Sequence, residues 1–111
     1  MILTEPIELE KLKEISKGFY PDRIKFCIDR IQKKVAIDEE MHIDMEWELI
    51  DAGANQNDIF GGDILLDPIS VIWESHPNIE RNRILHTGYG RKLEDEKLID
   101  ELFEILKYWV R

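Results

Sequence analysis

Residues 40–62 read EMHIDMEWELIDAGANQNDIFGG, and this stretch organises the rest of the chain. It runs from the end of a strand, through one short helix, to a glycine-terminated loop that feeds the next strand. Asp44 is expected to cap a helix over residues 44–52, because its carboxylate can accept hydrogen bonds from the first-turn amides. Gly53 ends that helix, and residues 55–58 form a polar loop. A site is expected here, since most of the chain's unusual polar side chains lie in this stretch.

Apolar residues alternate with polar ones on the N-terminal side of that stretch. Ile24, Phe26 and Ile28 fall on one face of an extended segment, whereas Cys27 falls on the other face. Similar patterns predict strands over residues 24–31, 34–37, 59–66 and 69–74, with a charged fifth candidate over residues 80–86 that suits a sheet edge.

The C-terminal segment shows the clearest helical pattern of the chain. Apolar residues recur at helical spacing over residues 93–110, with acids in the first turn and bases in the last. Further helices are predicted over residues 8–17 and 44–52, and residues 87–92 form a glycine-rich loop. The amides of this loop, with Arg91 and Lys92, could hold an anion, but the loop lacks the phosphate-loop spacing and a flexible connector is favoured. The prediction is one α+β domain over residues 1–111, with a mostly antiparallel sheet of four to five strands and three helices. The C-terminal helix packs on the sheet.

Charge and composition narrow the classes of function. The 111 residues contain 15 basic and 24 acidic side chains, which gives a formal net charge of −9. Binding to nucleic acid or to an anionic membrane needs clustered basic residues, so neither is expected. A basic protein or a metal cation fits the sign of the charge better. The single cysteine, Cys27, the absence of a secretory signal pattern and the lack of a long apolar run predict a cytoplasmic protein.

Glu40, His42 and Asp44 alternate along the chain. If this piece is extended, all three side chains point to the same side and begin a divalent metal site, or an acid orients His42 as a base. The simpler interpretation makes Asp44 a helix cap, leaves Glu40 solvated and gives His42 a local hydrogen bond. The simpler interpretation is favoured, because clusters this short recur by chance.

The remaining chemical candidates are isolated in the sequence. Cys27 could act as a nucleophile with His42, but its place inside a strand favours an inert thiol. His76 and His86 show no zinc-ligand spacing. No cofactor is evident, and a divalent metal is the only one that these residue types suggest.

Two short motifs resemble a prokaryotic family catalogued only as a domain of unknown function. Residues 40–44 match an E-L-H-A-D-like segment of that family, and residues 58–61 match a D-L-W-G-like segment in which Phe60 replaces Trp. The resemblance covers about a third of the chain and implies an α+β domain in an intracellular setting, without an activity. It marks His42, Asp44, Asp58 and Gly61 as candidate ligand-binding residues.

Three hypotheses follow for the function. The first is a non-enzymatic ligand-binding or protein-interaction module that acts as a homodimer, since no catalytic motif is present and the last helix has a wide apolar face. The second is a metal-assisted, hydrolase-like enzyme with a site around His42 and Asp44, joined by Glu40 or Asp58. The third is a regulatory partner of a basic protein, bound through the acidic surface.

Overall fold

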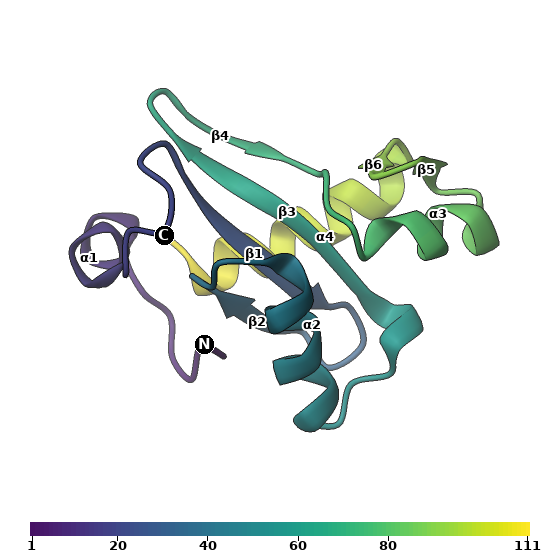
Figure 1. Ribbon diagram of the computed structural model, residues 1–111, viewed down its shortest axis with the longest axis horizontal. Coiled ribbons are helices and arrows are strands. Elements are labelled where there is room, and N and C mark those ends of the chain that lie inside the picture. The colour runs from purple at the N-terminus through teal and green to yellow at the C-terminus, as the bar shows by residue number, and fades with distance from the viewer.

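The chain folds into a four-stranded antiparallel sheet with helices on both faces, as described for residues 1–111 by a computed structural model (Figure 1). The strands are β1 (Arg23–Asp29), β2 (Lys34–Ile37), β3 (Ile59–Leu66) and β4 (Ile69–Ile72), in the spatial order β2-β1-β3-β4. The helices are α1 (Leu9–Ile15), α2 (His42–Asp51), α3 (Asn78–Leu85) and α4 (Glu96–Trp109), with one 3-10 turn, η1 (Gln56–Asp58). A separate hairpin consists of β5 (Gly88–Tyr89) and β6 (Lys92–Leu93). The predicted α+β class and antiparallel sheet are confirmed.

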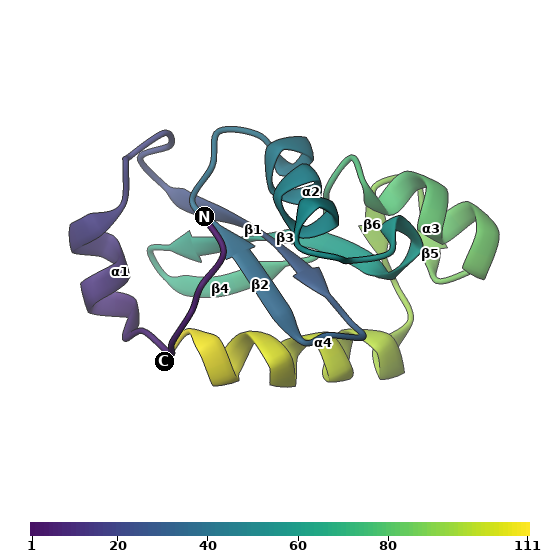
Figure 2. The same cartoon turned by 90° about the horizontal axis from the view of Figure 1, so that it is seen from below.

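Helix α4 covers one face of the sheet, as its apolar pattern predicts. Figure 2 shows the helix lying along the sheet, with α2 on the opposite side. Asp95 caps α4, since its carboxylate accepts a hydrogen bond of 2.9 Å from the amide of Leu98. The larger core cluster joins the inward side chains of the sheet to this helix and includes Ile24, Phe26, Ile28, Phe60, Ile64, Leu98, Leu102 and Ile105. Most of the large apolar side chains of α4 are buried or half-buried in this contact, whereas Phe103 and Tyr108 stay exposed.

Helix α2 covers part of the other face. Met45 and Leu49 pack against Cys27, Ala36 and Ile59 in a second, smaller cluster. The register pairs Lys25 of β1 with Asp63 of β3, so these charged residues continue the same face beyond the apolar cluster. The end of this face beyond the first turn of α2 is therefore polar.

Helix α2 begins two residues earlier than the sequence predicts. Met41 is its N-cap residue and makes no side-chain capping bond, so the prediction that Asp44 caps the helix is wrong. Asp44 lies inside the first turn, where the positive end of the helix dipole still stabilises an acidic side chain. Because residues 42–44 are helical, Glu40, His42 and Asp44 do not share one side of an extended segment.

Residues 80–86 form no edge strand, which corrects a second prediction. They lie in α3 and its C-cap, so the structure has four helices where three were predicted. The inward side chains of α3 are Asn78, Arg81 and Asn82, whereas Ile84 and Leu85 are exposed. A helix held by polar side chains shows no apolar stripe, so a hydrophobic pattern could not identify it. The loop predicted over residues 87–92 contains the β5–β6 hairpin.

Candidate functional site

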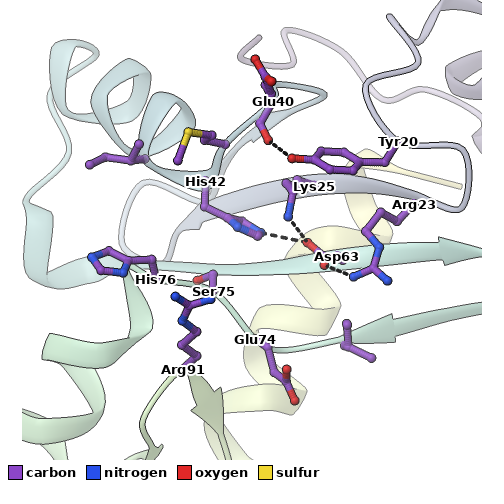
Figure 3. Close-up of a pocket in the computed structure, with 13 residues that line it drawn as sticks. Tyr20, Arg23, Lys25, Glu40, His42, Asp63, Glu74, Ser75, His76 and Arg91 are labelled. Atoms are coloured by element: carbon purple, nitrogen blue, oxygen red, sulfur yellow. Dashed lines mark hydrogen bonds and ion pairs between the residues drawn. The ribbon is translucent and has the colours of Figure 1, made fainter.

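A pocket of about 470 Å³ opens on the face of the sheet that α2 only partly covers. Its residues come from β1, the first turn of α2, β3, the segment after β4 and the β5–β6 turn (Figure 3). The lining residues are Tyr20, Arg23, Lys25, Glu40, Met41, His42, Ile43, Asp63, Ile72, Glu74, Ser75, His76 and Arg91. Charged and polar groups predominate in a cavity of ligand size.

The imidazole of His42 contacts two oxygens of β3. Its Nε2 atom lies 2.8 Å from the carbonyl oxygen of Gly62 and 2.9 Å from Oδ1 of Asp63. Both oxygens are acceptors, so Nε2 carries a hydrogen. The hydrogen on Nε2 faces both oxygens, so the ring contacts the carbonyl group of Gly62 and the carboxylate of Asp63 together. This contact fixes the first residue of α2 against the sheet.

Asp63 is surrounded by basic groups. Arg23 donates a hydrogen bond of 2.9 Å to Oδ2, and Lys25 Nζ lies 3.9 Å from Oδ1. Burial by itself raises the pKa of Asp63, but His42, Arg23 and Lys25 outweigh this effect and hold the pKa below its usual value. Asp63 is therefore ionised at neutral pH, and its charge is balanced inside the protein.

Tyr20 closes one side of the pocket. Its hydroxyl donates a hydrogen bond of 2.7 Å to the carbonyl oxygen of Glu40, and Lys25 Nζ lies 4.7 Å from the centre of its ring. The two contacts join the segment before β1 to the segment before α2. They also hold the ammonium group of Lys25 beside Asp63.

Ser75 lies in the floor of the pocket and packs against a glycine. The residue is 3% exposed, and its hydroxyl has no hydrogen-bond partner in the protein. A Cβ atom on Gly61 would lie 2.5 Å from Ser75 Oγ and 3.2 Å from Cδ2 of His42. Only a glycine at position 61 lets both Ser75 and His42 pack against this part of β3. No hydrogen bond joins the Ser75 hydroxyl to the His42 ring, so the two residues do not form a nucleophile–base pair.

The backbone around Arg91 is held by hydrogen bonds from Ser75, Asn78 and Asn82. The carbonyl oxygen of Arg91 accepts a bond of 3.1 Å from the Ser75 amide and one of 3.2 Å from Nδ2 of Asn78. Asn82 supports the same hairpin through bonds of 2.8 and 2.9 Å to the carbonyl oxygens of Gly90 and Lys92. These contacts fix the backbone position from which the Arg91 side chain extends.

The guanidinium group of Arg91 has no partner in the protein. Every other arginine donates to an acid or to a carbonyl oxygen, although the chain has an excess of acids. Figure 3 shows the side chain of Arg91 reaching toward Ser75, while the carboxylates of Glu40 and Glu74 point away from the centre of the pocket. The centre therefore contains one unpaired cation beside one unpaired hydroxyl.

The N-terminus of α2 adds donors at the same place. Met41, His42 and Ile43 line the pocket, and the amides of His42 and Ile43 make no hydrogen bond in the protein. Free amides and the positive end of the helix dipole both favour an anion. These donors and Arg91 lie in a lining where the other two basic side chains, Arg23 and Lys25, are paired with Asp63.

The residues singled out in the sequence are only partly brought together. His42 and Gly61 lie next to each other, and Glu40 lies on the rim of the pocket. Asp44 and Asp58 do not line it, and no group of three or more His, Cys, Asp or Glu side chains is arranged to hold a metal ion.

Two other sequence candidates also have clear positions. Cys27 is fully buried beneath α2, where its thiol contacts the carbonyl oxygen of His42 at 3.4 Å, and burial raises its pKa. Its position fits the inert thiol expected from the sequence. His76 lies on the rim of the pocket, and His86 is an exposed residue at the end of α3.

Asp63 and Ser75 were not identified as site residues from the sequence, and Arg91 was considered only as part of a glycine-rich loop for which a connector was favoured. The available signal for Asp63 was a charge inside an otherwise apolar strand, which is costly unless it is paired. No comparable signal marks Ser75.

Comparison with known proteins gives a family without an assigned activity. The model of a family described as a protein of unknown function (DUF5674) matches residues 1–108. No curated protein and no solved structure matches the chain. None of the helices combines the length and apolar character needed to cross a membrane. Because the match covers nearly the whole chain, this protein belongs to the DUF5674 family of proteins of unknown function.

Proposed function

We propose that this protein is a small-molecule-binding module and that its pocket takes an anionic ligand. The observation that carries the proposal is the unpaired guanidinium group of Arg91, whose backbone is held by Ser75 and Asn78. An arginine without a partner in a chain of net charge −9 is available to an external acid. The free amides of His42 and Ile43 add hydrogen-bond donors at the start of α2.

The balance of charges favours one small anion over a polyanion. Asp22 and Asp63 together balance the charges of Arg23 and Lys25, so Arg91 is the main uncompensated group. Glu40 and Glu74 stand on the rim and would repel a ligand that brings several negative charges. The ligand expected here carries a single carboxylate or phosphate group.

A thermal-shift screen tests the proposal. The panel contains inorganic phosphate, small carboxylates, nucleotides and divalent metals, with wild type, Arg91→Gln, Lys92→Gln and His42→Ala as the four proteins. A ligand at about one hundred times its Kd adds about 2.7 kcal/mol of stability, which moves the midpoint by several degrees. We expect an anion to shift wild type and Lys92→Gln but not Arg91→Gln.

Lys92 is the matched control because it carries the same charge next to Arg91 and lies outside the pocket. A shift that survives in Arg91→Gln, or the absence of a shift with every anion, would refute the proposal. A metal-dependent shift that is lost in His42→Ala would instead favour the metal-assisted enzyme predicted as an alternative.

Self-association is a second proposal, carried by exposed apolar side chains at the start of α2, two of which, Met41 and Ile43, also line the pocket. Met41 and Trp47 are each 56% exposed, and Ile43 is 40% exposed. Three large apolar side chains on one short segment are unusual on a free surface. Light scattering during size-exclusion chromatography should then give the mass of a dimer for wild type and of a monomer for Trp47→Ser. A monomeric wild type would exclude the homodimer, and binding to a basic protein would have to be tested by salt-dependent pull-down.

A further inference from the structure

We propose that β4 binds an extended, basic segment of a partner protein, which joins the sheet as an additional strand. The surface concerned is the outer edge of β4 together with a cavity beside Ile69. Binding at this edge does not depend on the anion pocket.

Alternate residues of β3 direct their backbone groups to opposite sides. Leu66 donates its amide hydrogen to the carbonyl oxygen of Asp22 at 3.0 Å, on the side of β1. Both backbone groups of Gly61 bond to Asn78, on the other side. Even-numbered residues of β3 therefore bond toward β1, and odd-numbered residues face β4.

The outer edge of β4 consequently has free backbone groups. Ser70 and Ile72 lie opposite odd-numbered residues of β3, so they bond to that strand. The amide and carbonyl groups of Ile69 and Val71 face outward, and those of Val71 have no hydrogen bond to any other segment. Free groups of this kind can pair with the backbone of an added strand.

The neighbouring turns limit the length of the open edge. The amide of Leu93 bonds to the carbonyl oxygen of Trp73 at 3.0 Å, on the same outer side, so the hairpin of β5 and β6 closes one end. The turn at Asp67 and Pro68 closes the other end. A segment of about four extended residues fits between them.

The opposite edge of the sheet is covered, whereas this one is open. On β2, the amide of Leu3 bonds to the carbonyl oxygen of Val35 at 2.9 Å, and residues 1–3 shield the strand. Figure 1 shows β4 as the outermost strand on its side of the sheet. Residues 69–72 read ISVI, without the charge or proline that usually prevents an edge from pairing with another chain, and Ile69 is 56% exposed.

A cavity of about 540 Å³ adjoins the start of this edge. Its wall consists of residues 6–10, Ile69 and Arg111. Because side chains on the same face of paired strands are neighbours, a side chain of the added strand beside Ile69 reaches this cavity. The apolar residues of the wall can contact the stem of a long side chain, and the carboxylate of Glu8 can contact its end. Lysine and arginine combine an apolar stem with a cationic end.

Unpaired acids lie at both ends of the strand. Asp67 directly precedes the edge, and Glu74 follows it by two residues. Both side chains are exposed, and neither forms an ion pair. Glu8, in the cavity wall, also has no ion pair. A basic segment would bring opposite charges to these positions.

The bases in the same region are less available. Arg111 stacks on the ring of Tyr108, 5.4 Å from its centre, and Figure 3 shows Arg91 directed into the pocket. Lys92 lies opposite Glu74 and can balance only that acid. The remaining charge favours a basic partner over an acidic one.

A synthetic peptide tests the proposal. The probe is a capped peptide of sequence Lys-Val-Thr-Val-Lys, in which β-branched residues lie between basic ends. Of two comparison peptides, one replaces both lysines with glutamate and the other has a methyl group on every backbone nitrogen. Each is titrated into isotope-labelled wild type, and amide chemical shifts are followed by NMR. We expect the largest shifts at Ile69 and Val71, none at Val35 of the covered edge, and binding of the glutamate peptide at least about tenfold weaker. The methylated peptide should not bind.

Two protein variants separate the backbone contribution from the charge contribution. Val71→Pro removes an outward amide hydrogen that β3 does not use, so it should fold and should weaken binding by about tenfold. Glu8→Gln with Glu74→Gln should weaken binding of the lysine peptide alone. The matched control is Asp51→Asn with Asp100→Asn, which removes two exposed acids without ion pairs from other elements. This control should bind as wild type does.

Several results would overturn the proposal. Failure of the lysine peptide to bind, or equal binding of the methylated peptide, would exclude strand addition. Equal binding of the lysine and glutamate peptides would exclude the basic partner. If the Val71 shift depends on protein concentration without peptide, a second copy of the chain occupies the edge instead. If Val71→Pro fails to fold, the methylated peptide decides, because it leaves the protein unchanged.

Discussion

The side-chain amide of Asn78 takes the place of a neighbouring strand beside Gly61. Its Oδ1 accepts a hydrogen bond of 2.8 Å from the Gly61 amide, and its Nδ2 donates one of 2.9 Å to the Gly61 carbonyl oxygen. Strand β4 pairs with β3 only from Asp63 to Leu66, so this part of β3 would otherwise have an open edge. One buried side chain thus joins α3 to the centre of the sheet.

Replacing Asn78 with alanine should lower the free energy of unfolding by about 3 kcal/mol, because several buried backbone groups lose their partner at once. Urea unfolding followed by tryptophan fluorescence measures the change. Asn57, an exposed residue of η1, is the matched control, and Asn57→Ala should change stability by less than about 0.5 kcal/mol. Equal stabilities of the two variants would contradict the role given to Asn78.

The buried ion pair between Arg81 and Glu46 should behave differently from an exposed one. Their side chains are 2.9 Å apart, and Arg81 also donates to the carbonyl oxygens of Pro77 and Gln56. Arg81→Met should cost about 3 kcal/mol because it leaves the Glu46 carboxylate buried without its partner, and Arg81→Met with Glu46→Met should recover part of that loss.

A double-mutant cycle measures this coupling, and the exposed pair Arg83–Glu80 of the same helix provides the control. Its coupling energy should stay below about 1 kcal/mol. Similar coupling energies for the two pairs would show that burial does not matter here.

Gly61→Ala should destabilise the protein by about 1–3 kcal/mol through overpacking, since the added carbon would lie 2.9 Å from Cβ and 2.5 Å from Oγ of Ser75. Ser75→Gly removes both of these atoms and should restore part of the stability when the two changes are combined. Thermal unfolding of the single and double variants measures the effect. If the double variant is no more stable than Gly61→Ala, the clash lies elsewhere.

The ion pairs of Asp63 should make stability depend on acid pH. The pKa of Asp63 in the folded protein lies below its ordinary value of 3.8, because His42, Arg23 and Lys25 outweigh the effect of burial. The stabilisation is therefore complete above that ordinary value and is lost as the pH falls through the lower, folded pKa. Wild type should be more stable than Asp63→Asn at about pH 7, and the difference should shrink below about pH 4.

Urea midpoints measured across this pH range provide the test. Asp100→Asn removes an exposed acid of α4 that has no ion pair, and it should stay close to wild type at every pH. A constant difference between wild type and Asp63→Asn at all pH values would contradict the electrostatic explanation.

The sheet and α4 were predictable because their side chains follow simple periods. Alternation in β1 assigned Phe26 and Cys27 to opposite faces, and the two residues do lie in different core clusters. The helical spacing in the last segment likewise identified α4. Burial of apolar surface leaves a visible pattern in the sequence, and these elements depend on it.

Helix α3 and the start of α2 were not predictable by the same reasoning. Asn78 and Asn82 hold α3 through hydrogen bonds to the backbone of distant segments, which no periodic pattern encodes. The first turn of α2 depends on the contact of His42 with Gly62, whereas the prediction relied on a capping side chain at Asp44. Tertiary contacts decided both boundaries.

Only part of the candidate site was predictable, because it too depends on tertiary contacts. His42 and Gly61 were singled out because they are unusual residues within the organising stretch. Asp63 joins them through the pairing of β3 with β1, and Arg91 joins them only when α3 is in place. Sequence spacing carries no information on that arrangement.

The polar attachment of α3 has a consequence for hydrogen exchange. A helix whose buried side chains are asparagines and an arginine can separate from the sheet while exposing little apolar core. Its amides should then exchange through local opening, whereas those of β1 and β3 should exchange only through global unfolding. Each such opening would release the carbonyl oxygen of Arg91 from Asn78. Ligand binding in the pocket should therefore slow amide exchange in α3 first, although the ligand need not contact that helix.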